Sequence, residues 1–186
     1  MGNAARRRAT YEDVLAAPEH VVAEVVDGVL RTQPRPAARH ARAASSLGGE
    51  LAGPFDRGRG GPGGWVLLDE PELHLGADIL VPDLAGWRRE RMPVFPYDAA
   101  FFTLAPDWIC EVLSPSTAKL DRGAKLTIYA RESVRHAWLV DPIDKTLEVL
   151  RIESGRWSRV AFFEDTAVVR AEPFDAIELE LGSLWP

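Results

Sequence analysis

The chain of 186 residues contains a single cysteine, Cys110, and no long apolar run. One cysteine excludes an internal disulfide framework and any zinc site built on cysteine pairs. Without about 18 consecutive apolar residues, no segment is predicted to span a membrane. The polar start of the chain carries Arg6, Arg7 and Arg8 with no apolar stretch behind them, unlike a secretory signal. Together these absences predict a cytoplasmic protein.

The chain also lacks an excess of positive charge: 22 Lys and Arg stand against 28 Asp and Glu, a net charge of −6. General attraction to nucleic acid usually comes from a basic surface. The charge is uneven, however, because residues 1–59 hold nine basic against seven acidic side chains, whereas residues 94–186 hold ten against fifteen. A phosphate-bearing partner is therefore expected to meet the N-terminal half and the Arg88–Arg91 segment, with strong sensitivity to salt.

The length of the chain fits one domain. We predict a flexible tail over 1–9 and a single domain over 10–186. In the first part of that domain, Thr10 and Asp13 resemble a capping box, which predicts a short helix. The β-branched run at 21–26 and the following Asp27-Gly28 predict a hairpin. Apolar spacing predicts a helix over 37–51, and the glycines and prolines of 53–64 predict a loop.

The second part of the chain mixes strands with one helix. Strands are predicted over 65–68, 79–81, 108–113 and 136–140, with Leu73 and Leu75 alternating around His74 in favour of an antiparallel pair. A helix is predicted over 120–132, and a β-meander over 146–152, 157–163 and 167–171. This order predicts an α/β fold of the mixed, α+β kind, with a mixed sheet.

Two acidic residues stand at unusual places. Asp83 follows the apolar strand 79–81 directly, and Glu111 lies inside the apolar run 108–113. A carboxylate in such a strand is costly unless it is paired, protonated or bound to a metal. If the two strands are neighbours, the carboxylates converge at one edge of the sheet, and two oxygen ligands with open positions suit Mg²⁺.

The helix over 120–132 carries further polar residues. Asp121, Lys125 and Tyr129 are spaced i, i+4 and i+8, so they share a face. A lysine packed near two carboxylates can stabilise negative charge that develops on phosphorus, or position an attacking water.

Four segments carry a resemblance to a known family: Val81-Pro82-Asp83, the stretch 106–116, the stretch 121–130, and Trp138 to Pro142. They resemble a bacterial family described as "putative restriction endonuclease", within the PD-(D/E)XK nuclease superfamily. The resemblance covers residues 10 to 184 and is most specific over 106–142. It implies a restriction-endonuclease-like core, with a mixed central β-sheet flanked by helices, an extra N-terminal hairpin and a C-terminal β-meander.

The resemblance also implies roles for particular residues. Asp83 and Glu111 would bind the metal, together with the backbone carbonyl of Val112. The superfamily places its lysine two residues after the glutamate, where this chain has Leu113. The resemblance assigns the lysine's role to Lys125 instead.

Two residues upstream complete the candidate set: Glu24 would be a further catalytic acid, and His40 an accessory residue. These residues and Lys125 also have structural explanations. Glu24 alternates within a hairpin strand where it could face water, and His40 could be packed in the core. Lys125 could be a solvated helix lysine. Asp83 could terminate its strand, and Glu111 could form an ion pair with Lys125.

The resemblance therefore predicts an endonuclease that hydrolyses phosphodiester bonds in DNA with Mg²⁺, or with Mn²⁺ in its place. A homodimer is expected, because duplex cutting commonly uses two active sites and the meander offers a free strand edge. The displaced lysine favours an alternative, a catalytically weak nuclease-fold module acting in DNA binding or protein interaction. Hydrolysis of a different phosphoester is a third hypothesis, and the choice between DNA and RNA stays open.

Overall fold

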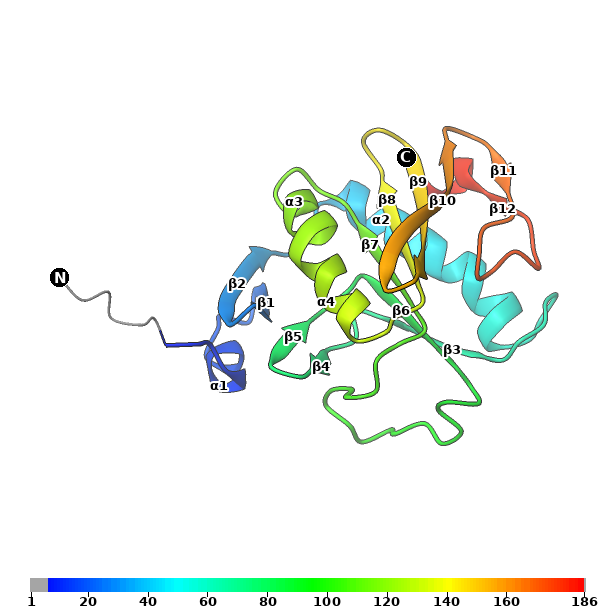
Figure 1. Cartoon of the computed structure of the whole chain (residues 1–186). Helices are drawn as coiled ribbons and strands as arrows, with labels where there is room; N and C mark the ends of the chain where they lie inside the picture. The colour runs from blue at the N-terminus through cyan, green and yellow to red at the C-terminus, as the bar shows by residue number, and fades with distance from the viewer. Residues whose placement is uncertain (1–6, 186) are drawn as a thin grey trace.

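A mixed six-stranded sheet forms the centre of the protein, as the computed structural model shows for residues 7–185 (Figure 1). Its strand order is β10-β9-β8-β7-β6-β3, in which β7 and β8 are parallel and every other pair is antiparallel. The strands are β3 (Trp65–Asp69), β6 (Leu84–Arg88), β7 (Trp108–Val112), β8 (His136–Asp141), β9 (Thr146–Glu153) and β10 (Arg156–Glu164). The predicted mixed sheet is therefore confirmed.

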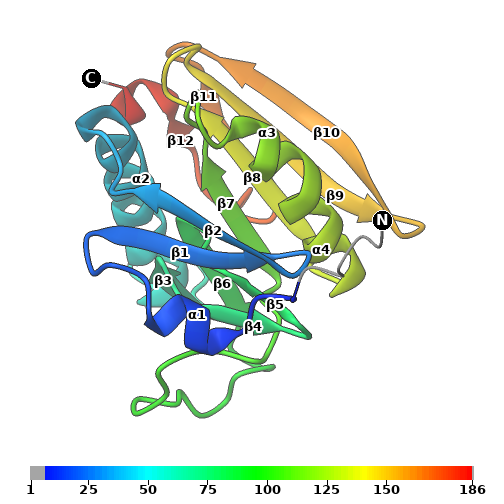
Figure 2. The same cartoon turned by 90° about the vertical axis from the view of Figure 1, so that its left-hand side faces the viewer.

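The central strand β7 separates two layers, because its side chains alternate between the two faces of the sheet. Trp108 and Cys110 pack into a core with the helix α2 (Ala38–Leu51). Ile109 and Leu113 pack into a second core with the helix α4 (Leu126–Arg131). Figure 2 shows α2 and α4 on opposite sides of the sheet. Glu111, between Cys110 and Val112, therefore faces the α4 side.

A smaller four-stranded sheet lies against the α4 side, in the order β2-β1-β5-β4. Its strands are β1 (Val21–Val26), β2 (Val29–Pro34), β4 (Leu73–Leu75) and β5 (Asp78–Leu80), all antiparallel. The predicted hairpin is confirmed: Asp27 and Gly28 form its two-residue turn with φ angles of 53° and 76°. Both residues adopt the left-handed conformation that tight hairpin turns of this kind require.

The N-terminal segment contacts this hairpin. The capping box predicted at Thr10 is present at the start of the helix α1 (Tyr11–Leu15). The backbone N–H of Ala9 donates to the carbonyl of Gly28 at 2.9 Å, and Arg7 pairs with Asp13 at 2.6 Å. Residues 1–6 of the predicted tail lie outside the described residues, as does residue 186.

Two expectations about the middle of the chain were wrong. The segment 53–64 is not entirely loop, because α2 continues into a π-helical turn, η1 (Ala52–Asp56), which buries Phe55 in the core. The predicted strands 79–81 and 108–113 are not neighbours, because β5 and β7 belong to different sheets. On the side away from β8, the neighbour of β7 is β6, a strand that the sequence patterns did not predict. Asp83 lies immediately before β6.

Close packing at Gly86 explains why β6 was hard to recognise. A Cβ atom there would lie 2.8 Å from the Leu67 side chain and close to Trp65 and Trp108. Glycine is depleted in strands, so it weakens the local strand signal even where the packing requires it.

The C-terminal region departs from the predicted meander. The strands β9 and β10 form the expected hairpin, but β11 (Val168–Val169) leaves the central sheet. It pairs with β12 (Leu179–Glu180), and a short 3₁₀ helix, η3 (Leu181–Leu184), follows. This segment packs on the α2 side, where Phe174 contacts four aromatic rings.

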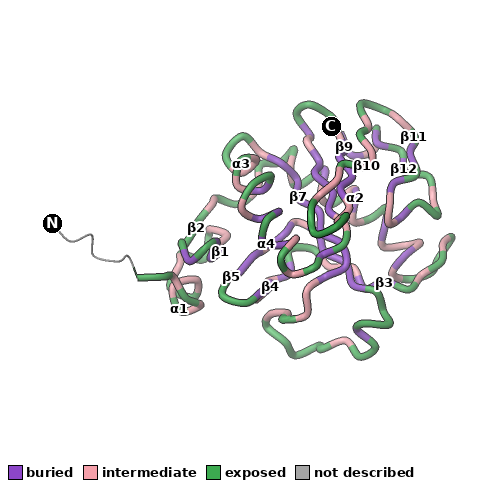
Figure 3. The backbone as a smooth tube through the Cα atoms, viewed as in Figure 1, coloured by how far each residue is buried: buried purple, intermediate pink, exposed green. Residues whose placement is uncertain are grey.

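The buried apolar residues gather in the two cores on either side of the central sheet (Figure 3). Cys110 is fully buried, as expected for a small apolar residue. Four tryptophans are at most 1% exposed: Trp65, Trp87, Trp108 and Trp138. They pack in the core and do not form a surface on which nucleic-acid bases could stack. Over residues 7–185, the longest helices are too short and too polar to cross a bilayer.

Candidate active site

A buried lysine stands at the junction of the two sheets. Lys125 is 1% exposed, and its Nζ lies 2.9 Å from Glu111 Oε1, 3.0 Å from Glu24 Oε1 and 3.7 Å from Asp121 Oδ1. Tyr129 donates its hydroxyl to Glu111 Oε1 at 2.7 Å. Three carboxylates and a phenol thus surround one ammonium group, and the fully solvated lysine considered from the sequence is wrong.

The helical segment that carries Lys125 is continuous but not uniform. It consists of α3 (Ala118–Leu120), a π-helical turn η2 (Asp121–Lys125) and α4. The predicted shared face is present, because Asp121, Lys125 and Tyr129 are all buried toward Glu111. A π turn within a helix is frequent at functional sites.

Glu24 links the small sheet to this cluster. Its Oε1 accepts the backbone N–H of Val81 at 2.8 Å as well as the ammonium of Lys125, and its Oε2 accepts the Gln33 amide at 3.1 Å. Glu24 is 0% exposed, so the expectation that it could face water is wrong. The sequence reading missed Gln33, whose signal was its place on the strand opposite Glu24 in the predicted hairpin.

Asp83 occupies the other side of the site. Its Oδ2 accepts the backbone N–H of Val112 at 2.7 Å, which fixes the carboxylate to the end of β7. Its Oδ1 lies 3.3 Å from Nε2 of His40, on the first turn of α2. Within the described chain, His40 Nδ1 is buried without a hydrogen-bond partner. His40 is therefore an Asp83 neighbour and not simply a packed core residue.

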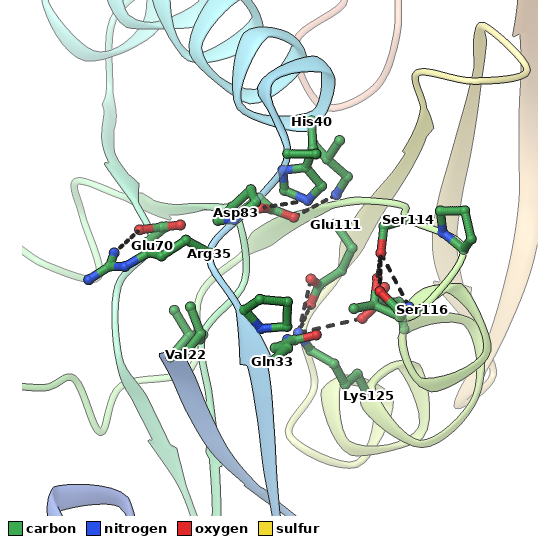
Figure 4. Close-up of a pocket in the computed structure, with 18 residues that line it drawn as sticks. Val22, Gln33, Arg35, His40, Glu70, Asp83, Glu111, Ser114, Ser116 and Lys125 are labelled. Carbon is green, nitrogen blue, oxygen red and sulfur yellow. Dashed lines mark hydrogen bonds and ion pairs between the residues drawn. The ribbon is translucent and has the colours of Figure 1, made fainter. Parts of the chain in front are cut away.

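One pocket of about 330 Å³ opens onto these groups (Figure 4). Asp83, Glu111 and Lys125 line it together with His40, and Figure 4 shows Asp83 pointing to His40 and Glu111 pointing to Lys125. Glu24 is absent from the lining, because it lies behind Lys125. The sequence-predicted residues therefore converge, with Glu24 in an outer position.

Burial and crowding change the acidity of the cluster. Desolvation raises the pKa of Glu111 well above its ordinary value, and the surrounding carboxylates raise it further against the effect of Lys125. Burial and Glu111 likewise raise the pKa of Tyr129, which stays a hydrogen-bond donor. Burial alone would lower the pKa of Lys125, but Glu111 and Glu24 outweigh it and raise that pKa. The lysine therefore stays charged.

Negative charge exceeds positive charge at the site. Five carboxylates meet there, those of Glu24, Glu70, Asp83, Glu111 and Asp121, against two permanent cations, Lys125 and Arg35. Over the part of the chain that the structure describes, no three His, Cys, Asp or Glu side chains are arranged to hold a metal ion. A cation here would rely on two carboxylates at most, which is the usual protein contribution to Mg²⁺.

The Arg88–Arg91 segment lies elsewhere. Arg88 is the last residue of β6, whereas Asp83 precedes its first residue, so the two stand at opposite ends of the strand. Arg89 and Arg91 each form an ion pair with an acidic residue, at 3.0 Å and 2.8 Å. This segment is therefore poorly placed to serve the pocket.

One known protein family matches nearly the whole chain. The protein-family model Uma2, described as "Putative restriction endonuclease", matches residues 9–182. The chain belongs to the Uma2 family. A comparison with curated proteins gives no significant match. Membership of Uma2 confirms the resemblance drawn from the sequence motifs.

A solved structure shares the fold. It is described as a "putative nuclease belonging to DUF820" from Anabaena variabilis, is 23% identical, and aligns with a TM-score of 0.75. The alignment covers 95% of this chain and 97% of that chain. The Uma2 chain thus has the mixed α+β architecture of that protein over nearly its whole length.

Proposed function

We propose that the chain is a divalent-cation-dependent endonuclease that hydrolyses phosphodiester bonds in DNA. The observation that carries this proposal is the excess of carboxylates over cations on the wall of an open pocket. The carboxylates of Glu70, Asp83, Glu111 and Asp121 on this wall outnumber its two permanent cations, Arg35 and Lys125, and leave negative charge that a divalent cation would neutralise. Family membership supports the reaction class, because the family is described as "Putative restriction endonuclease".

The donor set fits Mg²⁺, with Mn²⁺ as a substitute. Asp83 and Glu111 offer carboxylate oxygens from neighbouring positions in the large sheet, and both line the pocket together with Val112. We assign the metal to these two side chains and the carbonyl of Val112. When bound, the cation would lower the pKa of a coordinated water and neutralise charge on the scissile phosphate.

The surrounding residues hold this set in place. Lys125 binds Glu111 and presents a permanent positive charge at the pocket, where it would stabilise negative charge developing on the phosphate. Tyr129 donates its hydroxyl to Glu111 Oε1 and so orients the Glu111 carboxylate. Glu24 holds Lys125 from behind, and His40 orients Asp83.

Conservative variants test the proposal. With Asp83→Asn or Glu111→Gln, we expect no heat of Mg²⁺ binding in calorimetry and about a 100-fold or greater loss of plasmid nicking. The matched control is Glu164→Gln, an exposed carboxylate on β10 outside the pocket. Binding heat and nicking equal to those of the parent protein in both site variants would overturn the assignment.

A second candidate is a nuclease-fold module that binds DNA or protein with little catalysis. The observation that favours it is that both Glu111 oxygens are already engaged, one by Tyr129 and both by Lys125. In this case the parent protein and Asp83→Asn would bind DNA equally and neither would nick it. Plasmid nicking by the parent alone would instead support the enzyme.

A homodimer remains part of the proposal. Among residues 7–185, the strand β10 has only one neighbour, β9, so its other edge is open for pairing with a second copy. Sedimentation velocity with and without DNA tests this. A monomer under both conditions would remove the dimer from the proposal.

A further inference from the structure

A groove of about 700 Å³ leads away from the pocket. One wall is residues 31–34 of β2, and the other is residues 116–124 at the start of the α3–α4 segment. These two elements lie side by side in both views of the fold (Figures 1 and 2). Gln33, Pro34 and Ser116 line the groove and the pocket alike, so the two spaces adjoin.

The charge of the groove is opposite to that of the pocket. Arg31 lines one wall and Lys119 the other, and no acidic residue lines either wall. The Arg31 and Lys119 side chains are both exposed. Among residues 7–185, neither of them forms an ion pair, although nine arginines other than Arg31 do. Two free cations thus flank a channel that ends at a carboxylate cluster.

We propose that this groove binds the polynucleotide strand on one side of the scissile phosphate, with Arg31 and Lys119 contacting successive phosphates from opposite walls. The proposal rests on the proposed function, because the strand is placed by a cleavable phosphate in the pocket. Positively charged grooves that follow a phosphate backbone are the usual means of binding a strand without sequence preference. The apolar floor at Pro34 and Leu120 gives the sugars and bases a surface to lie on.

An acidic peptide is the competing occupant of such a groove. The position of the groove favours a polynucleotide. The groove adjoins the pocket, so a single chain would present one phosphate to the carboxylates and metal and the next ones to the basic residues. A peptide carboxylate, by contrast, would gain nothing from an adjoining acidic pocket.

Gly123 provides a sharp probe of the groove. It lines the groove, is exposed, and a Cβ atom built on it meets no other atom within 4 Å. Gly123→Glu therefore adds a negative charge to the groove without a clash. The matched control is Gly49→Glu, on exposed α2, where a Cβ atom also meets nothing within 4 Å and the site lies outside both spaces.

The experiment measures binding of a fluorescein-labelled DNA oligonucleotide, in single-stranded and duplex form, by anisotropy over a series of salt concentrations with Ca²⁺ in place of Mg²⁺. Arg31→Glu, Lys119→Glu and Gly123→Glu should each weaken binding on the order of tenfold. Arg31→Ala and Lys119→Ala should each lower the slope of log affinity against log salt by about one. Gly49→Glu should bind as the parent does.

Each outcome is decisive. If the groove variants bind and nick DNA like the parent while Asp83→Asn loses nicking, the groove assignment falls and the proposed function stands. If the groove variants lose binding but the parent never nicks DNA, the groove stands and the catalytic proposal falls. If a fluorescein-labelled polyglutamate peptide binds the parent more tightly than the oligonucleotide and loses affinity in the same variants, the occupant is an acidic protein segment and the proposal is overturned.

Discussion

Removing the buried cation is the strongest test of the cluster. In Lys125→Met a side chain of similar length stays, but the ammonium that lies within 3.0 Å of Glu24 and Glu111 and 3.7 Å of Asp121 is lost. Breaking a buried ion pair on one side costs about 3–5 kcal/mol, because the remaining charge is left without a partner. For a chain of this size, that loss lowers Tm by roughly 6–20 °C.

The loss should depend on pH with a definite sign. In the variant, burial and mutual repulsion hold the folded-state pKa of Glu111 far above its value in the unfolded chain, with no lysine to oppose them. The folded state then binds more protons than the unfolded state, so its stability falls as pH rises through this window. As pH rises above the ordinary pKa of a glutamate, the difference between parent and variant should therefore grow.

Urea unfolding followed by tryptophan fluorescence measures this difference. Lys119→Met, an exposed lysine on the same helical segment, is the matched control and should leave the free energy of unfolding within about 0.5 kcal/mol of the parent. The double variant Glu24→Gln/Lys125→Met removes one unpaired charge and should recover part of the loss. A variant Lys125→Met that is as stable as the parent at high pH would refute the reasoning about the cluster.

Three further predictions concern the rest of the fold. Phe174→Ala should cost about 3–5 kcal/mol in urea unfolding, because the buried ring packs against four aromatic rings, and a loss under 1 kcal/mol would contradict that packing. Gly86→Ala should destabilise the protein by about 1–3 kcal/mol, because its Cβ would lie 2.8 Å from a leucine side chain. Gly123→Ala, where a Cβ meets no atom within 4 Å, should stabilise the helix by up to about 1 kcal/mol. The reverse order of melting temperatures for the two variants would overturn this reasoning. Arg7 lowers the pKa of the Asp13 carboxyl to about 2. In Arg7→Ala, the Asp13 pKa measured by NMR titration should rise toward its ordinary value of 3.8. An unchanged Asp13 pKa would show that the ion pair does not persist.

The strands of the central sheet could be predicted wherever side chains alternate or form apolar runs. The runs at 108–113 and 136–140 predicted β7 and β8 closely. The strand β6 could not be found in this way, because Gly86 is imposed by the packing of Trp65 and Trp108 from other strands. The separation of β11 from the meander is also tertiary in origin, since its partner β12 comes from later in the chain.

The site residues could be named from the sequence, but not their arrangement. The spacing of Asp121, Lys125 and Tyr129 predicted one face of a helix, and the structure turns that face to Glu111. The strand expected to bring Asp83 next to Glu111 was wrong, because β5 lies in the other sheet and Asp83 instead stands immediately before β6, a neighbour of β7. The burial of Glu24 depends on contact between two sheets, which no local pattern in one strand records.

The place of Glu24 on β1 has a consequence for the folding of the protein. Its carboxylate joins Lys125 to Gln33 on β2, so neither sheet can complete the cluster alone. Local opening of the hairpin, at a free energy below that of global unfolding, would therefore separate Glu24 from Lys125 while the six-stranded sheet stays intact. In native-state hydrogen exchange, the amide of Val81, which donates to Glu24, should exchange together with the hairpin amides and ahead of those of β7.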